Sequence, residues 1–267
     1  PPMAHQVRNA TTCCRMNKLT NIACPTAVII GLLVLWWLVV DQTQSLIFPT
    51  PQKVLTGMFA LAADGSLWKH IGMSLMRVAA GFILAVLVGV PMGLWMGRVD
   101  GVYRTLNPLF QMLRPISPIA WIPLTILWFG VGNTSPVFLI FLASVFPLIV
   151  QTSAGVHTIE QRYLRAAENF GVSRGVLLRQ VVFPAVLPEI LVGMRVGLGV
   201  AWLVVVAAEM IAPVSGLGYL IIDSRNAGSR YDLVIGVMII IGLIGLMLDI
   251  GMRRLEKLKS IRWRYGR

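Results

Sequence analysis

The 267-residue sequence is poor in charge, since Asp, Glu, Lys and Arg together make up only 13% of it. A soluble domain carries about a quarter of its residues as these four types. Hydrophobic residues instead reach 57%, and the mean hydropathy is +0.77. They come in runs of roughly 20, the length of helix that crosses the ~30 Å hydrocarbon core of a bilayer. The composition therefore predicts an all-α membrane protein without a large soluble domain.

Sequence motifs of catalysis and metal binding are absent. The chain contains no Gly-Lys dipeptide, so it has no P-loop to cradle the phosphates of a nucleotide. It also lacks an HExxH zinc motif and a GxSxG nucleophile elbow, and its three histidines lie far apart. The three cysteines, Cys13, Cys14 and Cys24, show no metal-ligand spacing. We therefore expect the chain to be no enzyme and to hold no metal or cofactor of its own.

Six apolar runs are long enough to span a membrane. They cover Ile22–Val40, Gly72–Gly97, Leu106–Gly130, Ser135–Gly155, Ala185–Ala212 and Leu233–Met252. The first is longer than the apolar region of a signal peptide and is followed by DQTQS rather than a small-residue cleavage site, so we expect it to be retained. The third is interrupted by prolines. Six spans place both chain termini on one side of the membrane.

The basic residues between these runs are distributed asymmetrically. Sixteen Lys and Arg residues fall in the N-terminal segment 1–21, the second and fourth connections and the tail 253–267, whereas the other connections hold four. Cytoplasmic segments keep the excess of positive charge. The sequence thus predicts a multi-pass protein of the cytoplasmic (inner) membrane, with both termini in the cytoplasm and a transmembrane domain at 22–252. We expect the basic tail to touch anionic membrane lipid and no nucleic acid.

The fourth connection carries the stretch RAAENFGVSRGVLLRQVVFP, Arg165 to Pro184. Apolar residues recur at helical spacing up to Phe170 and again after Gly171, which predicts two short amphipathic helices hinged at that glycine. Pro184 is expected to end the second helix. Two interpretations are open: the segment lies on anionic lipid, or it sinks into a groove of a partner protein, which the small Ala166 and Ala167 would permit.

This stretch resembles the cytoplasmic signature of ABC-importer permeases, which reads Glu-Ala-Ala, three residues, Gly, nine residues, a branched apolar residue, any residue, Leu and Pro. The positions that match are Ala166, Ala167, Gly171, Val181 and Pro184. Arg165 stands in place of the leading Glu and Phe183 in place of the Leu. The stretches FPTPQKVL, SLMRVAAGFILAVLVGVPMGLWMG, LRPISPIAWIPLTILWFG and GMRVGLGVAWLVVVAAEM also look like permeases of the nitrate, sulfonate, taurine and bicarbonate branch.

The resemblance implies a type I ABC importer permease that moves a small anion. It further implies a homodimer, two cytoplasmic ATPase subunits that bind the ATP and Mg, and an extracytoplasmic substrate-binding protein. In such importers the signature is the loop that couples the permease to the ATPase, here 157–184. The residues it assigns to coupling are Arg165, Ala166, Ala167, Glu168, Gly171 and Pro184.

Five charged residues fall inside the predicted spans, where charge is costly and marks candidate functional sites. Asp249 stands four residues before Arg253, so we expect these two to form an ion pair along one helix. Arg77 and Glu209 both lie near the outer ends of their spans and are expected to pair as a structural bridge. All of the others, Arg77, Arg114, Arg195 and Glu209, are retained as candidate residues of the solute path.

Arg114 and Arg195 are expected at similar depth near the middle of the membrane, without an acidic partner. One hypothesis is that they define an anion path, aided by backbone carbonyls that the prolines Pro115, Pro118 and Pro123 release. The other is that both arginines bind carbonyls at helix ends and only hold the bundle together.

Glycines at four-residue spacing, Gly89, Gly93 and Gly97 and also Gly193 and Gly197, permit close helix contact. The sequence leaves open whether these contacts lie within one chain or between two. An alternative function is an ion-coupled secondary transporter or channel that works without an ATPase. That function predicts inverted repeats or acidic rings, which the sequence does not show. A membrane scaffold would explain the loop but not the arginines.

Overall fold

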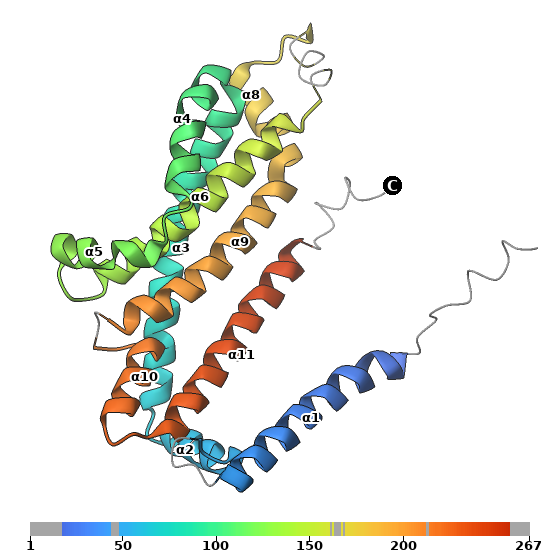
Figure 1. The fold of residues 1–267 in the computed structure, drawn as a ribbon. Helices are drawn as coiled ribbons and strands as arrows, with labels where there is room; N and C mark the ends of the chain where they lie inside the picture. Colours follow the sequence, from blue (N-terminus) through green and yellow to red (C-terminus); the bar gives the residue numbers. More distant parts are fainter. Residues whose placement is uncertain are drawn as a thin grey trace, which may run out of the picture.

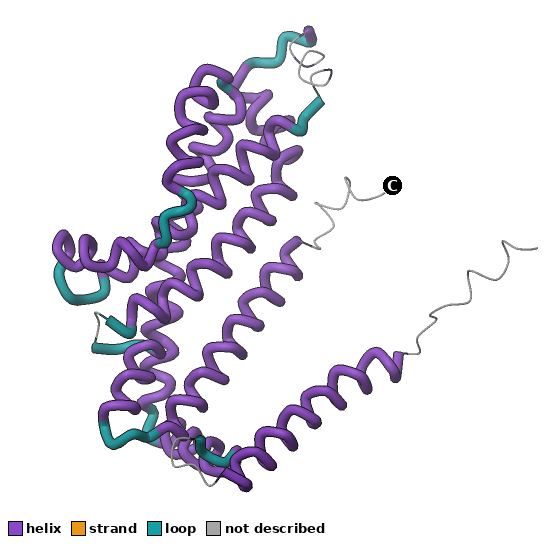
Figure 2. Tube along the Cα trace, viewed as in Figure 1, coloured by secondary structure: helices purple, strands orange, loops and turns teal. Residues whose placement is uncertain are grey.

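The computed structural model describes residues 18–43, 48–160, 162, 167, 169–211 and 214–256. These residues form helices joined by loops and turns, with no strand among them (Figure 2). The predicted all-α membrane fold is confirmed. Most of the predicted N-terminal segment and most of the basic tail lie outside the described residues.

Four helices are long and apolar enough to cross a membrane, and they correspond to predicted spans. They are α3 (Ser66–Arg98), α6 (Thr134–His157), α9 (Phe183–Glu209) with the turns that precede it, and α11 (Tyr231–Glu256). The predicted third span is broken, because α4 (Asp100–Leu113) meets the segment η1 (Pro118–Trp121) and α5 (Ile122–Phe129) at 84°. Ser117, just before Pro118, takes the extended backbone that proline favours in its predecessor.

The first predicted span lies in α1 (Lys18–Thr43), which leans away from the other helices (Figure 1). Its 26 residues give a length of about 39 Å, enough for a bilayer core. Leu32, Leu35 and Trp37 are all exposed, so this apolar helix lacks a covering layer from the described part of the chain. Whether α1 crosses the membrane stays a prediction.

Two short helices were not predicted: α2 (Pro51–Ala63) and α10 (Leu217–Asn226). Both pack beside the start of α11, at the end of the molecule opposite α8 (Figure 1). The start of α2 carries a recognisable signal, since Thr50 caps it by accepting the Lys53 amide and Pro51 occupies the first turn. The loop before α10 turns at Gly216, which has a φ of +111°.

The central helix is α6, which packs against α3 on one side and α9 on the other. The glycine ladder of α3 faces it: a Cβ at Gly93 would lie 2.6 Å from Thr152 Cβ, and one at Gly97 2.6 Å from Val156 Cβ. On the other side, the Ser144 hydroxyl donates to the Gly197 carbonyl at 3.2 Å. These glycine contacts therefore lie within one chain.

Substituting Gly93 with leucine is expected to destabilise the fold, because the side chain has no room between α3 and α6. Overpacking of this kind costs roughly 1–3 kcal/mol, or more where the backbone must move. Gly72→Leu on the same helix is the matched control, since nothing lies within 4 Å of a Cβ there. Thermal unfolding of the detergent-purified protein compares the two, and an unfolding temperature for Gly93→Leu equal to that of the control would contradict the packing.

The prediction that Pro184 ends a helix is wrong. Helix α8 (Arg174–Leu177), the π-helical turn η2 (Leu178–Val182) and α9 run on as one helix of 35 residues, Gly175–Glu209. Proline lacks the N–H that an α-helix needs, but the π turn just before it already departs from the i→i−4 pattern and absorbs that loss. The second half of the signature stretch is consequently continuous with α9.

Candidate functional site

The loop that carries the importer signature is described only in part, because Arg165, Ala166 and Glu168 lie outside the described residues. Gly171 has a φ of +70°, a left-handed conformation that glycine adopts without steric cost. No atom lies within 4 Å of a Cβ built there, so the backbone turn, and not space, requires glycine. The permissive backbone predicted at Gly171 is therefore present, while most of the predicted helix before it lies outside the described residues.

The base of this loop is packed and its tip is exposed. Ile159, Ala167 and Val172 pack against a core cluster at the end of α3, α6 and α9 that contains Leu94, Val156, Leu177, Val182, Val186 and Ile190. Phe170, predicted to share the apolar face of Ile159 and Ala167, is instead 87% exposed. It directly precedes the left-handed turn, where the helical repeat ends, so its side chain leaves that face. The loop thus exposes the aromatic ring of Phe170 on its surface.

A cavity of about 260 Å³ lies at the break between α4 and α5. Its lining comes from the break itself and from α6 and α9, and includes Arg114, Pro118, Trp121, Phe146, Val196 and Val200. Arg114 is the only charged residue among the described residues that line it. No ion pair of Arg114 exists within the described part of the chain. This arrangement offers one guanidinium beside apolar walls.

Arg195 does not share that cavity, and the expectation that it lacks an acidic partner is wrong. Its Nε donates to Asp249 Oδ1 at 2.7 Å, and its Nη1 lies 3.5 Å from Glu256 Oε2. The predicted pair along α11 is confirmed, since Arg253 Nε lies 2.8 Å from Asp249 Oδ2. Asp249 thus binds Arg195 through one carboxylate oxygen and Arg253 through the other. The sequence predicted only its contact with Arg253, which lies on the same helix.

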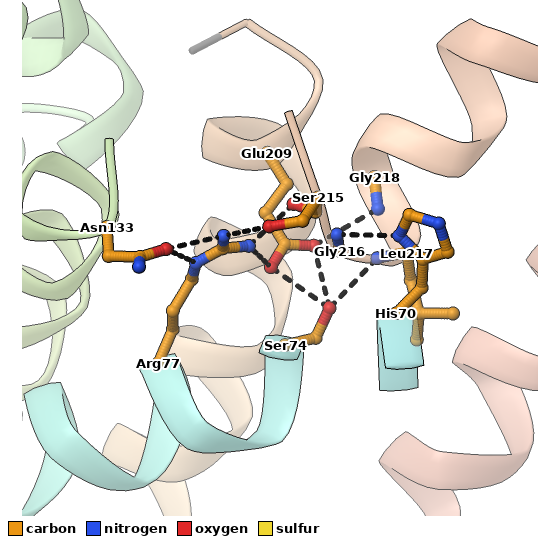
Figure 3. A network of polar contacts seen from close by, with 9 residues as sticks. All are labelled: His70, Ser74, Arg77, Asn133, Glu209, Ser215, Gly216, Leu217 and Gly218. Atoms are coloured by element: carbon orange, nitrogen blue, oxygen red, sulfur yellow. Dashed lines mark hydrogen bonds and ion pairs between the residues drawn. The ribbon is translucent and has the colours of Figure 1, made fainter. Parts of the chain in front are cut away.

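The expected pair between Arg77 and Glu209 is confirmed at 2.6 Å, and both side chains are fully buried. The Arg77 guanidinium also donates to Asn133 Oδ1 and to the backbone and side-chain oxygens of Ser215, at 2.6 to 3.0 Å (Figure 3). A guanidinium has five N–H donors, and five bonds to the protein account for them. In this conformation Arg77 has no donor left for a solute.

The same network holds the loop before α10 through three consecutive backbone amides. Gly216 N donates to His70 Nδ1 at 3.0 Å, Leu217 N to Ser74 Oγ at 2.9 Å and Gly218 N to Glu209 Oε2 at 3.1 Å (Figure 3). A Cβ at Gly216 would lie 2.2 Å from Glu209 Cδ, so the loop approaches the carboxylate as only glycine allows. Arg77 and Glu209 therefore fasten α3, α9 and two loops at the end of the molecule opposite α8.

Comparisons with known proteins agree on one family. Residues 85–260 match the family described as "Binding-protein-dependent transport system inner membrane component". The taurine transport system permease protein TauC of Escherichia coli (strain K12) is 39% identical over 233 residues, covering 85% of this chain and 84% of that protein. The nitrate import permease protein NrtB of Synechocystis sp. is 32% identical over 257 residues, covering 91% and 93%.

A solved structure shares the fold. It is an inward-facing conformation of the MetNI methionine ABC transporter, with a TM-score of 0.63 and 15% sequence identity. The match covers 72% of this chain and 94% of that one. The predicted type I importer permease fold is therefore confirmed.

Proposed function

The chain belongs to the family of binding-protein-dependent transport system inner membrane components, and from that premise we propose that it carries a small anion across the cytoplasmic membrane as the permease of an ATP-driven importer. The relatives named for taurine and nitrate import support a small solute that presents an anionic group, such as a sulfonate or nitrate. Bicarbonate and aliphatic sulfonates belong to the same class of small anions.

One structural observation carries the proposal. The helix Gly175–Glu209 begins three residues after Val172 of the signature loop and also supplies Val196 and Val200 to the wall of the Arg114 cavity. A movement imposed on the loop in the cytoplasm is thereby passed to the cavity wall by a continuous helix. This is the connection that an importer driven by a separate ATPase needs.

The partners follow from the same proposal. Cytoplasmic ATPase subunits bind the ATP and Mg and dock on the loop around Gly171, because this chain has no P-loop. An extracytoplasmic binding protein delivers the solute at the end that carries α2 and α10. Two copies of the chain enclose the path, with both termini of each in the cytoplasm.

Among the candidate residues of the path, we propose that Arg114 contacts the solute and that the others stabilise the packing of the helices. Arg114 lines a cavity and has no acidic partner among the described residues, whereas Arg195 pairs with Asp249, and Arg77 and Glu209 are buried in their own network. A guanidinium binds nitrate, carboxylate or sulfonate oxygens through paired N–H donors, and Arg114 is exposed, so a solute can reach it.

Replacing Arg114 with glutamine is expected to lower anion uptake about tenfold or more, because a hydrogen bond to a charged group is worth roughly 1.5–3 kcal/mol. Uptake of labelled taurine, nitrate, bicarbonate and an alkanesulfonate, measured at matched expression, identifies the solute and the effect together. Arg104→Gln is the control, since Arg104 is an exposed arginine of α4, the helix that ends just before Arg114, and this variant should transport normally. Equal uptake by both variants would remove Arg114 from the path.

A further inference from the structure

A groove of about 630 Å³ lies between α9 and α11 and shares Val196 and Val200 of α9 with the Arg114 cavity. Its walls are mostly apolar and include Val196 and Leu203 of α9 and Leu248 and Met252 of α11. Two polar contacts between these helices lie along it. Trp202 Nε1 donates to the Ile241 carbonyl at 3.0 Å, and Arg195 Nε donates to Asp249 Oδ1 at 2.7 Å. The groove runs along the same stretch of the two helices, which lie side by side in Figure 1.

One end of the groove carries charges of both signs. The Arg195 side chain is 32% exposed there, and among the described residues it makes one hydrogen bond, to Asp249. Arg253, on the other oxygen of Asp249, is 57% exposed. Glu256 Oε1 is buried and has no hydrogen-bond partner within the described part of the chain. A buried carboxylate oxygen without a donor is costly, and the described part of the chain, which ends at Glu256, supplies neither a cation nor a donor to it. The same end offers guanidinium groups to an anion.

The position of the groove matches one leaflet of the bilayer. Its charged end is the cytoplasmic end of α11 by the predicted orientation. Because Arg195 pairs with Asp249 at that end, it lies nearer the cytoplasmic interface than the mid-membrane depth expected from the sequence. From Arg195 to Leu203, the apolar wall rises about 12 Å along α9, close to half of the ~30 Å hydrocarbon core. A ligand that fits has a polar group at the cytoplasmic interface and an apolar chain that reaches toward the middle of the membrane.

We propose that this groove binds a phospholipid of the inner leaflet with an aminoethyl headgroup. The phosphate meets the guanidinium groups of Arg195 and Arg253, the ammonium donates to Glu256 Oε1, and an acyl chain fills the apolar part. A phosphatidylglycerol or a free phosphate would satisfy the arginines but would bring no cation to Glu256 Oε1, only neutral hydroxyl donors at most. An apolar helix of a second copy would satisfy neither charge.

Native mass spectrometry of the complete transporter tests this proposal after exchange into nanodiscs of equal phosphatidylethanolamine and phosphatidylglycerol content. The wild type is expected to retain one phosphatidylethanolamine per protomer. Gly199→Trp fills the groove, since Gly199 lines it and has nothing within 4 Å of a Cβ, and should lose that lipid. Met247→Trp is the matched control on α11, because Met247 is 70% exposed and lies outside the lining, and should keep it.

A second variant tests the headgroup separately from the groove. Glu256→Gln is expected to keep a bound lipid but to lose about fivefold of its preference for phosphatidylethanolamine, the factor of a partly exposed ion pair. An unchanged preference in this variant would overturn the headgroup assignment, and retention of the lipid by Gly199→Trp would overturn the site. A disulfide between two copies through Leu203→Cys, in a chain whose native cysteines are serine, would show that a second copy covers the groove and would also overturn it.

Discussion

Replacing Phe170 with glutamate is expected to separate the chain from its ATPase while leaving the chain folded. The side chain is 87% exposed at the tip of the signature loop, so its removal costs the permease little packing. Aromatic residues buried in a partner's pocket typically contribute 2 kcal/mol or more to binding, roughly a thirtyfold change in affinity. The measurement is the amount of P-loop ATPase that copurifies with the tagged chain, with thermal unfolding recorded for the same sample.

The matched control for this experiment is Val131→Glu. Val131 is 70% exposed and lies in the connection between α5 and α6. By the predicted topology this connection is on the opposite side of the membrane from the signature loop. It should leave the amount of ATPase unchanged. Gly171→Asp is a second test, since a side chain at a φ of +70° strains the hinge. Full recovery of the ATPase with Phe170→Glu would show that the loop tip is not the docking surface.

Replacing Arg77 with methionine is expected to destabilise the protein by about 3–5 kcal/mol, because it leaves the Glu209 carboxylate buried and uncompensated. Both side chains are fully buried, and the guanidinium also serves Asn133 and Ser215. Thermal unfolding in detergent and the yield of monodisperse protein measure the loss. Arg225→Met, which removes an exposed arginine of α10, is the control and should unfold like the wild type.

The double variant Arg77→Met with Glu209→Leu distinguishes a buried charge from lost packing. Removing both charges avoids the uncompensated carboxylate, so the double variant should be more stable than Arg77→Met alone. A double variant that is less stable than either single one would show that the loop amides at Gly218 and Leu217, and not the charge, dominate the network.

Spans, glycine ladders and charge pairs could be predicted because each depends on spacing along the sequence. The pair between Asp249 and Arg253 follows from their separation of four, whereas Arg195 lies 54 residues from Asp249 and only the packing of α9 on α11 brings it there. The pair between Arg77 and Glu209 was predicted only from their similar depth in the membrane, near the outer ends of their spans. The interruption of the third span was visible in its prolines, although the bend of 84° was not.

The three hydrogen bonds that hold the loop before α10 could not be predicted, since their donors are backbone amides, which carry no residue-specific signal. The one trace in the sequence is the Ser-Gly-Leu-Gly stretch beginning at Ser215, whose first glycine adopts a positive φ. The prediction at Pro184 was wrong although the residue carries a strong signal. A proline normally ends a helix, and the π turn that accommodates it becomes visible only with coordinates.

The most direct test of the account is solute uptake by proteoliposomes that contain this chain, its ATPase and its binding protein. An ATP-driven importer is expected to show uptake that requires ATP on the side of the ATPase, persists without an ion gradient and is lost with Phe170→Glu. Uptake by the chain alone, driven by a proton or sodium gradient and indifferent to ATP, would contradict it and establish an ion-coupled transporter instead.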